Sequence, residues 1–238
     1  MRYYYSHFYH RESSLFNFSI TQGVRFLILL NFTIFILQLC AGVFITAILG
    51  VMNIAHFQPF LPANTLMGLV LGFYIPNFLK GMIWEPITYQ FLHSGLSHLF
   101  FNMLWLFVFG PDVELYFGRK RFYVFYLFCG ALAVLSNLFP YVLTGHHNPV
   151  IGASGSVMSV LMAFAYLNPE REFFLFPFPI PINAKGIVLM VVILNLLYSL
   201  GESNYSVLTH LCGLGCGYIF VSLEYNGYLY KIWNKLGI

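Results

Sequence analysis

A motif of small residues, Gly152-Ala153-Ser154-Gly155, stands where a polar loop gives way to an apolar run that begins at Val150. A serine at the start of a hydrophobic helix exposes its hydroxyl, and the free backbone amides of the first helical turn lie close enough to hold a developing oxyanion. This setting suits a nucleophile. The same four residues also suit close helix packing in a membrane, so the motif alone leaves both interpretations open.

A serine hydroxyl needs a base to become a nucleophile at neutral pH, and histidine supplies one with a suitable pKa. His210, His98 and Asn102 are polar residues inside other apolar runs of the chain. No carboxylate is placed to orient a histidine. Asp112 is the only aspartate, and the glutamates fall in loops, in tails or near the C-terminal ends of apolar runs. A serine hydrolase built from these residues would therefore use a Ser–His dyad.

The composition places these residues in a membrane. Of the 238 residues, 59% are hydrophobic and only 8% are charged, and the mean hydropathy is +0.77. Such a chain cannot cover a soluble core with polar surface. The formal net charge of +3 is too small to indicate nucleic acid as a partner. We therefore expect a polytopic protein whose surroundings are the lipid bilayer.

Six apolar runs approach the length of roughly 20 residues that a helix needs to cross a bilayer. They are residues 25–49, 96–117, 122–140, 150–167, 186–200 and 206–224. A seventh run, residues 65–79, is shorter and contains glycine and proline, which is typical of a surface-lying or re-entrant segment within a long first loop. The sequence predicts an all-α membrane protein, a six-transmembrane-helix bundle whose long first loop, residues 53–94, is external.

Lysine and arginine set the predicted orientation. With the N-terminus inside, ten of the eleven basic residues fall on the cytoplasmic side, and Lys80 alone falls outside. The chain then divides into a cytoplasmic tail at residues 1–23, a membrane domain at 24–226 and a second cytoplasmic tail at 227–238.

Predicted spans two, four and six all run inward from the outer surface, so the polar residues near their first turns share one depth. These residues are His98 and Asn102 in span two, Ser154 in span four and His210 in span six. Ionisable residues inside a membrane are costly and usually face a partner or a water-filled cavity. Gly213 and Gly217 follow His210 on one helix face, and packing that face against Gly155 would bring His210 towards Ser154.

Several spaced motifs occur in order between about Trp84 and Gly217. They are Thr88-Tyr89-x-Phe91-Leu92-His93 before His98-x3-Asn102, Glu114-x3-Gly118-x2-Arg121-Phe122, Gly152-x-Ser154-Gly155 and His210-x2-Gly213-x3-Gly217. In this combination the chain resembles the rhomboid family of intramembrane serine proteases. The resemblance implies a six-helix bundle with a water-filled cavity open to the outer side, in which transmembrane segments of single-span proteins are cleaved.

By this resemblance, Ser154 is the nucleophile and His210 the general base. His98, Asn102 and the backbone amide of Ser154 form the oxyanion hole. Structural packing is assigned to the small residues Gly152, Gly155, Gly213 and Gly217. No cofactor and no metal are expected.

Two positions depart from the family pattern. Trp84-Glu85 stands where a Trp-Arg pair is common, which bears on the lipid contacts of the first loop. Thr209 stands where a small residue usually precedes the histidine of span six, which bears on the packing of the imidazole. Neither departure removes a catalytic group.

Other intramembrane proteases fail on residues, because a zinc enzyme would need His-Glu-x-x-His and a two-aspartate enzyme cannot be built from one Asp. A six-span transporter is an alternative, although paired broken helices and a charged ring are lacking. A protein that binds membrane clients without cleaving them is another, although it would not need both Ser154 and His210. We expect a rhomboid-type serine endopeptidase in the bacterial inner (cell) membrane, with transmembrane proteins as substrates and both termini cytoplasmic.

Overall fold

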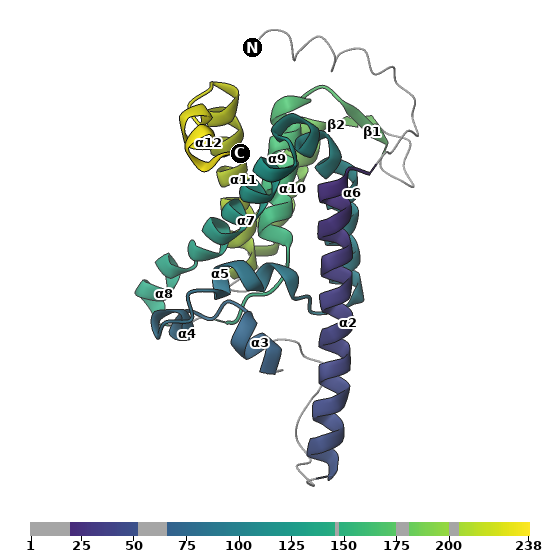
Figure 1. Ribbon diagram of the computed structural model, residues 1–238, viewed down its shortest axis with the longest axis vertical. Coiled ribbons are helices and arrows are strands. Elements are labelled where there is room, and N and C mark those ends of the chain that lie inside the picture. The colour runs from purple at the N-terminus through teal and green to yellow at the C-terminus, as the bar shows by residue number, and fades with distance from the viewer. Residues whose placement is uncertain (1–19, 52–65, 146–147, 175–180, 200–204) are drawn as a thin grey trace.

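The computed structural model describes residues 20–51, 66–145, 148–174, 181–199 and 205–238. Most of the predicted N-terminal tail and the beginning of the predicted first loop lie outside the described residues. The helices are α2 (Gln22–Val51), α3 (Leu66–Leu71), α4 (Ile75–Leu79), α5 (Glu85–Thr88), the 3₁₀ turn η2 (Tyr89–Phe91), α6 (Leu96–Phe117), α7 (Arg119–Leu135), α8 (Leu138–Thr144), α9 (Ser154–Leu167), α10 (Ala184–Ser199), α11 (Tyr205–Tyr225) and α12 (Tyr230–Leu236). They form a helical bundle with α3, α4 and α5 towards one end and α12 towards the other (Figure 1).

Within the described ranges, four helical segments are long and apolar enough to cross a bilayer: α2, α6, α7 together with α8, and α11. The helices α9 and α10 are also apolar but shorter, with 14 and 16 residues. A bilayer core of about 30 Å needs about 20 helical residues, so length alone identifies four spans. The mostly helical chain is a multi-pass membrane protein, and a count of six crossings stays a prediction.

The distribution of side chains is the one expected for a bundle surrounded by lipid. Large apolar side chains such as Phe100, Leu143 and Leu197 are exposed, whereas the polar Asn31 and Ser159 are fully buried. Soluble proteins rarely expose contiguous apolar faces of this kind. The exposed faces are therefore the ones that contact acyl chains.

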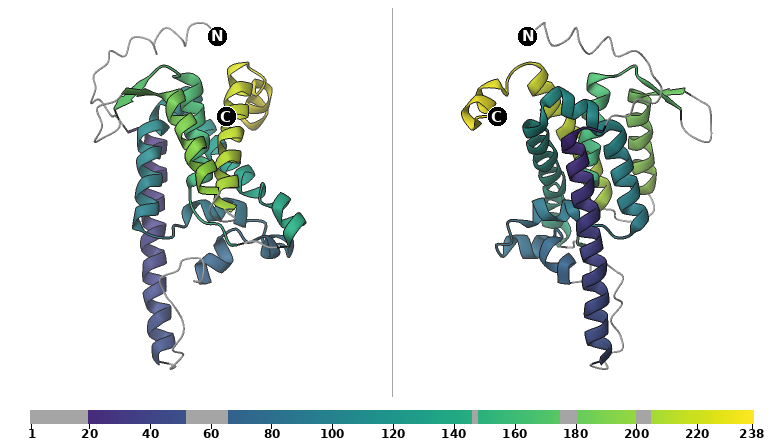
Figure 2. Two further views of the ribbon diagram at one scale, coloured as in Figure 1. Left: turned by 180° about the vertical axis from the view of Figure 1, so that it is seen from behind. Right: turned by 45° about the vertical axis from the view of Figure 1, so that its right-hand side comes forward.

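The helix α9 lies at the centre, in contact with α6, α7, α10 and α11. It fits there because its packing faces carry small residues, among them Gly155, Ser156, Ser159 and Ala163, all of which are buried. Small side chains allow helix backbones to approach closely in a membrane. The helix α2 packs beside α6 and extends well past the rest of the bundle (Figure 2).

Outside the predicted first loop, two features of the described residues go beyond the predicted helical spans. Strands β1 (Glu172–Phe174) and β2 (Pro181–Asn183) pair antiparallel between α9 and α10, with Phe173 opposite Ile182. The second is α12, which lies in the predicted C-terminal tail and buries Trp233. Both are too short to appear as apolar runs of membrane-spanning length, which explains why hydropathy did not predict them.

Candidate active site

Ser154 and His210 meet between α9 and α11. Ser154 is the first residue of α9, and His210 lies in the second turn of α11. The Nε2 atom of His210 is 2.8 Å from the Ser154 Oγ atom, and both residues are half-buried. The distance is that of a good hydrogen bond, so the imidazole is placed to take the hydroxyl proton.

Close packing of α9 against α11 brings this pair together. A Cβ atom added to Gly213 would lie 2.4 Å from the carbonyl oxygen of Gly155, and one added to Gly217 would lie 2.5 Å from that of Ser159. The Ser159 hydroxyl is 2.8 Å from the Gly213 carbonyl oxygen and 3.0 Å from that of Gly155. These residues, Gly155, Ser159, Gly213 and Gly217, therefore form a seam in which neither Gly213 nor Gly217 has room for a side chain.

A turn that requires glycine leads into α9. Gly152 has a φ of +124°, which side-chain-bearing residues rarely adopt, and a Cβ atom there would lie 2.6 Å from the His98 ring. The Gly152 amide donates to the Tyr89 carbonyl at 2.9 Å. Val150 exchanges two backbone hydrogen bonds with Phe73, of 2.9 and 3.0 Å. The segment after α3 and the turn η2 thus hold the backbone that presents Ser154.

The hydrogen bonds of His98 favour one tautomer of its ring. Its Nδ1 atom accepts the Ser94 backbone N–H at 3.4 Å and is 3.0 Å from the Ser94 hydroxyl. A backbone N–H can only donate, so Nδ1 is the acceptor and the neutral ring carries its proton on Nε2. A Cβ atom on Gly152 would lie 2.8 Å from that Nε2 atom, so the donor lies against the turn before Ser154.

Asn102 lies one helical turn after His98 on the same face of α6. Its Nδ2 atom donates to the His98 carbonyl oxygen at 2.9 Å, and the residue is 6% exposed. A side-chain amide carries two N–H groups. One N–H of Asn102 is thus used within α6, and the second is left for another acceptor.

Two side chains beside the site were not predicted from the sequence. Asn195 of α10 places its Oδ1 atom 2.8 Å from His210 Nδ1. Gln38 of α2 accepts the His93 backbone N–H at 3.0 Å and donates to the His93 carbonyl at 3.3 Å, which holds the chain just before α6. An amide side chain inside an apolar span is the signal that would have found both, and Asn195 is the only amide in its predicted span, residues 186–200.

Glu85, which departs from the family pattern, is fully buried. It accepts the Tyr74 backbone N–H at 3.0 Å, and burial raises the pKa of its carboxyl group. The neighbouring Trp84 donates its indole N–H to the Val70 carbonyl at 2.8 Å. Both residues thus join α5 to the segment containing α3 and α4.

Thr209, the second departure, is buried behind the site. Its hydroxyl oxygen accepts the Nδ2 hydrogen of Asn137 at 2.8 Å. Its methyl carbon would lie 3.1 Å from a Cβ atom on Gly155. Thr209 therefore packs against α9 and the turn between α7 and α8, and it leaves the contact between His210 and Ser154 in place.

Comparison with known proteins gives a consistent result. The sequence profile of the rhomboid domain matches residues 80–226, more than half of the chain. The chain is 28% identical over 156 residues to the rhomboid-family protein YdcA of Bacillus subtilis (strain 168), covering 66% of this chain and 72% of the relative. It is 31% identical over 141 residues to the rhomboid protease GluP of the same organism, covering 58% of this chain and 25% of the relative. It is also 32% identical over 95 residues to the rhomboid protease GlpG of Salmonella newport (strain SL254), covering 40% of this chain and 32% of the relative.

Proposed function

The chain belongs to the rhomboid family, and on that premise we propose that it is an intramembrane serine endopeptidase. The observation that carries the proposal is the 2.8 Å contact between Ser154 Oγ and His210 Nε2 at the start of α9. A nucleophile within hydrogen-bond distance of a base is the arrangement required for hydrolysis through a covalent acyl-enzyme intermediate. A protein that only binds membrane clients has no need of that contact.

In the proposed reaction, His210 Nε2 accepts the hydroxyl proton while Ser154 Oγ bonds to the carbonyl carbon of the scissile peptide. The tetrahedral intermediate collapses with breakage of the C–N bond, and His210 delivers the proton to the leaving amine. Water then attacks the acyl ester, with His210 as base, and releases the free carboxyl group and the Ser154 hydroxyl.

The negative charge of the tetrahedral intermediate needs hydrogen-bond donors. We assign this role to the Nε2–H of His98, the second N–H of Asn102 and the backbone amide of Ser154. The Nε2–H tautomer of His98 supports the assignment, because a ring with its proton on Nδ1 would present a lone pair to the oxyanion. The amide of Ser154 belongs to the first turn of α9, where backbone N–H groups lack helical partners.

The proposed substrates are single-span membrane proteins, cleaved near the outer face. Peptide carbonyls within a transmembrane helix are already hydrogen-bonded and shielded, so Ser154 attacks only where the helix unwinds. Residues that weaken a helix near the outer end of the substrate should favour cleavage.

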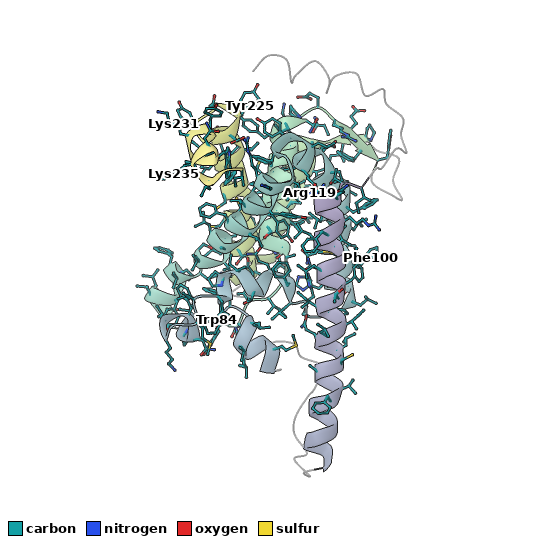
Figure 3. All side chains as sticks on the ribbon, in the orientation of Figure 1. Trp84, Phe100, Arg119, Tyr225, Lys231 and Lys235 are labelled. Atoms are coloured by element: carbon teal, nitrogen blue, oxygen red, sulfur yellow. The ribbon has the colours of Figure 1, made fainter. Side chains whose placement is uncertain are left out.

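We place the protein in a bacterial inner membrane with both termini cytoplasmic. Arg119, Lys231 and Lys235 lie towards one end of the bundle, and Trp84 lies towards the other (Figure 3). This grouping supports the orientation, because basic residues are enriched on the cytoplasmic side. Ser154 is the first residue of α9 and His98 lies in the first turn of α6. In the proposed orientation both turns face the outer side.

Cleavage in a reconstituted bilayer tests the proposal. The full chain is placed in liposomes with a fluorescently tagged single-span protein, and fragments are followed by gel electrophoresis and mass spectrometry. We expect wild-type protein to cut within or beside the transmembrane segment and Ser154→Ala to leave the substrate intact. Binding of the substrate without cleavage, by wild-type protein folded as judged by circular dichroism, would instead support a client-binding role.

A further inference from the structure

Asn195 lies in the C-terminal half of α10 and makes two hydrogen bonds of well-defined polarity. Its Nδ2 atom donates to the Val191 carbonyl oxygen at 2.9 Å. Its Oδ1 atom is 2.8 Å from His210 Nδ1. The reversed amide would set two oxygens against each other at Val191, so the bond to Val191 requires that the amide oxygen face the imidazole.

This orientation determines which nitrogen of His210 carries the proton. An amide oxygen can only accept, so the neutral imidazole donates from Nδ1 and keeps a lone pair on Nε2. The Nε2 atom that carries this lone pair is 2.8 Å from Ser154 Oγ. The bond from Asn195 thus selects the one neutral tautomer in which His210 can act as base.

We propose that Asn195 is a positioning residue for His210, which makes the reacting unit a chain of three side chains, Asn195–His210–Ser154. The proposal rests on the proposed protease function, since it concerns the same pair. Asn195 fixes the tautomer and the ring orientation of His210 and touches neither substrate nor the reacting atoms. An amide takes the orienting place that a carboxylate holds in many serine hydrolases, without adding a charge inside the membrane.

A second asparagine separates this role from a purely structural one. Asn31 of α2 donates to the carbonyl oxygen four residues earlier, that of Leu27, at 2.8 Å, as Asn195 does in α10. The Oδ1 atom of Asn31 is buried and has no hydrogen-bond partner among the described residues. The bond to the preceding turn therefore needs no histidine, and the oxygen contact to His210 is the feature specific to Asn195.

The packing of α10 explains how Asn195 reaches α11. The buried residues of α10 are Ala184, Ile187 and Val191, which recur on one helical face. Asn195 follows Val191 by one turn and continues that face. The face of α10 that packs into the bundle thus places the Asn195 amide against the His210 imidazole.

The test measures kcat and KM of full-length variants in liposomes with a single-span substrate. Asn195→Ala should lower kcat about 10- to 100-fold with KM unchanged, because the base spends most of its time in the wrong tautomer or orientation. Asn195→Asp keeps the acceptor oxygen and should recover most of the lost kcat. Asn31→Ala removes an asparagine with the same bond to its own helix and should keep the wild-type kcat.

The outcomes separate this inference from the proposed function. An Asn195→Ala protein with the kcat of wild type, or an Asn195→Asp protein with a kcat as low as that of Asn195→Ala, overturns the positioning role of Asn195. The proposed protease function still stands in either case, provided that wild-type protein cleaves the substrate. Cleavage by Ser154→Ala, or none by folded wild type, overturns the protease itself.

A measurement on the unaltered chain applies even if Asn195→Ala fails to fold. Nitrogen NMR of ¹⁵N-histidine-labelled protein, with the signals of His210 assigned by comparison with His210→Ala, should show a protonated Nδ1 and an unprotonated Nε2. The opposite tautomer would overturn the inference.

Discussion

The helix α6 carries a polar cluster at each end, and the two clusters use their hydrogen bonds differently. Near its C-terminal end, Glu114 is 5% exposed, and both of its oxygens accept hydrogen bonds from the start of α2. Oε1 accepts the Gly23 amide at 2.8 Å, and Oε2 accepts the Val24 amide at 2.7 Å and the Thr21 hydroxyl. Arg119 adds an ion pair at 3.9 Å. The carboxylate thereby supplies acceptors for helical amides that lack partners within α2.

At the other end of α6, His98 and Asn102 keep donors in reserve. The Nε2–H of His98 lies against Gly152, and Asn102 uses one of its two amide hydrogens within its own helix. Ser154 and His210 beside them are half-buried rather than sealed. In a membrane, a polar group whose bonding capacity is filled by its neighbours supports the fold, whereas a donor left over beside Ser154 is placed to act on a bound substrate.

The largest expected effect concerns the Ser154–His210 pair. Ser154→Ala, His210→Ala and the double variant should each abolish detectable cleavage, and the double variant should be no slower than either single one, because the two residues act as a unit. Progress curves of substrate cleavage, with circular dichroism as the control for folding, give the comparison. Full activity in His210→Ala would require a different base.

The reserved donors should show the next largest effect. His98→Ala should lower kcat by roughly 10²–10³-fold with little change in KM, because the donor acts on charge that develops in the transition state. The exposed neighbour Ser97 provides a control, and Ser97→Ala should leave kcat unchanged. A His98→Ala variant with wild-type kcat would mean that His98 supports the fold and does not stabilise the oxyanion.

The seam between α9 and α11 offers a matched pair of glycines. Gly213→Ala would place a methyl group 2.4 Å from a backbone oxygen, whereas Gly215→Ala on the same helix meets nothing within 4 Å. Displacing α11 stretches the distance between His210 and Ser154, so Gly213→Ala should reduce kcat by up to about 10²-fold. Gly215→Ala should behave as wild type. Equal kcat values for the two variants would show that the seam does not set the geometry of the site.

The smallest effect on activity is expected at the saturated end of α6. Glu114→Ala leaves the Thr21 hydroxyl and the amides of Gly23 and Val24 without their acceptor, which should lower the unfolding free energy by roughly 1–3 kcal/mol. Unfolding in detergent mixtures measures this loss, and kcat per folded molecule should be unchanged. A fall in kcat without a loss of stability would show that Glu114 takes part in the reaction, and it would contradict the distinction drawn between the two ends of α6.

Much of the helix arrangement could be predicted from the sequence, because runs of apolar residues and regularly spaced small residues are local signals. Ser154, His98 and His210 could be grouped by depth alone, and the glycines after His210 indicated the helix face that meets α9. The three-dimensional partners of the imidazole were a different matter. Asn195 was not predicted because the usual orienting residue is a carboxylate, and no spacing within α10 shows which residue of another helix its amide contacts. The paired strands β1 and β2 and the helix α12 were not predicted, because segments of so few residues are too short for hydropathy to be informative.

Covalent labelling of the native protein by a fluorophosphonate, with the modified residue located by peptide mass spectrometry, reports directly whether the Ser154 hydroxyl is activated. A fluorophosphonate reacts with a serine only where a base activates the hydroxyl. We predict one adduct, on Ser154, formed by wild-type protein and lost in His210→Ala. An adduct on a different residue, no adduct on folded wild type, or equal labelling of Ser154 without His210 would contradict it.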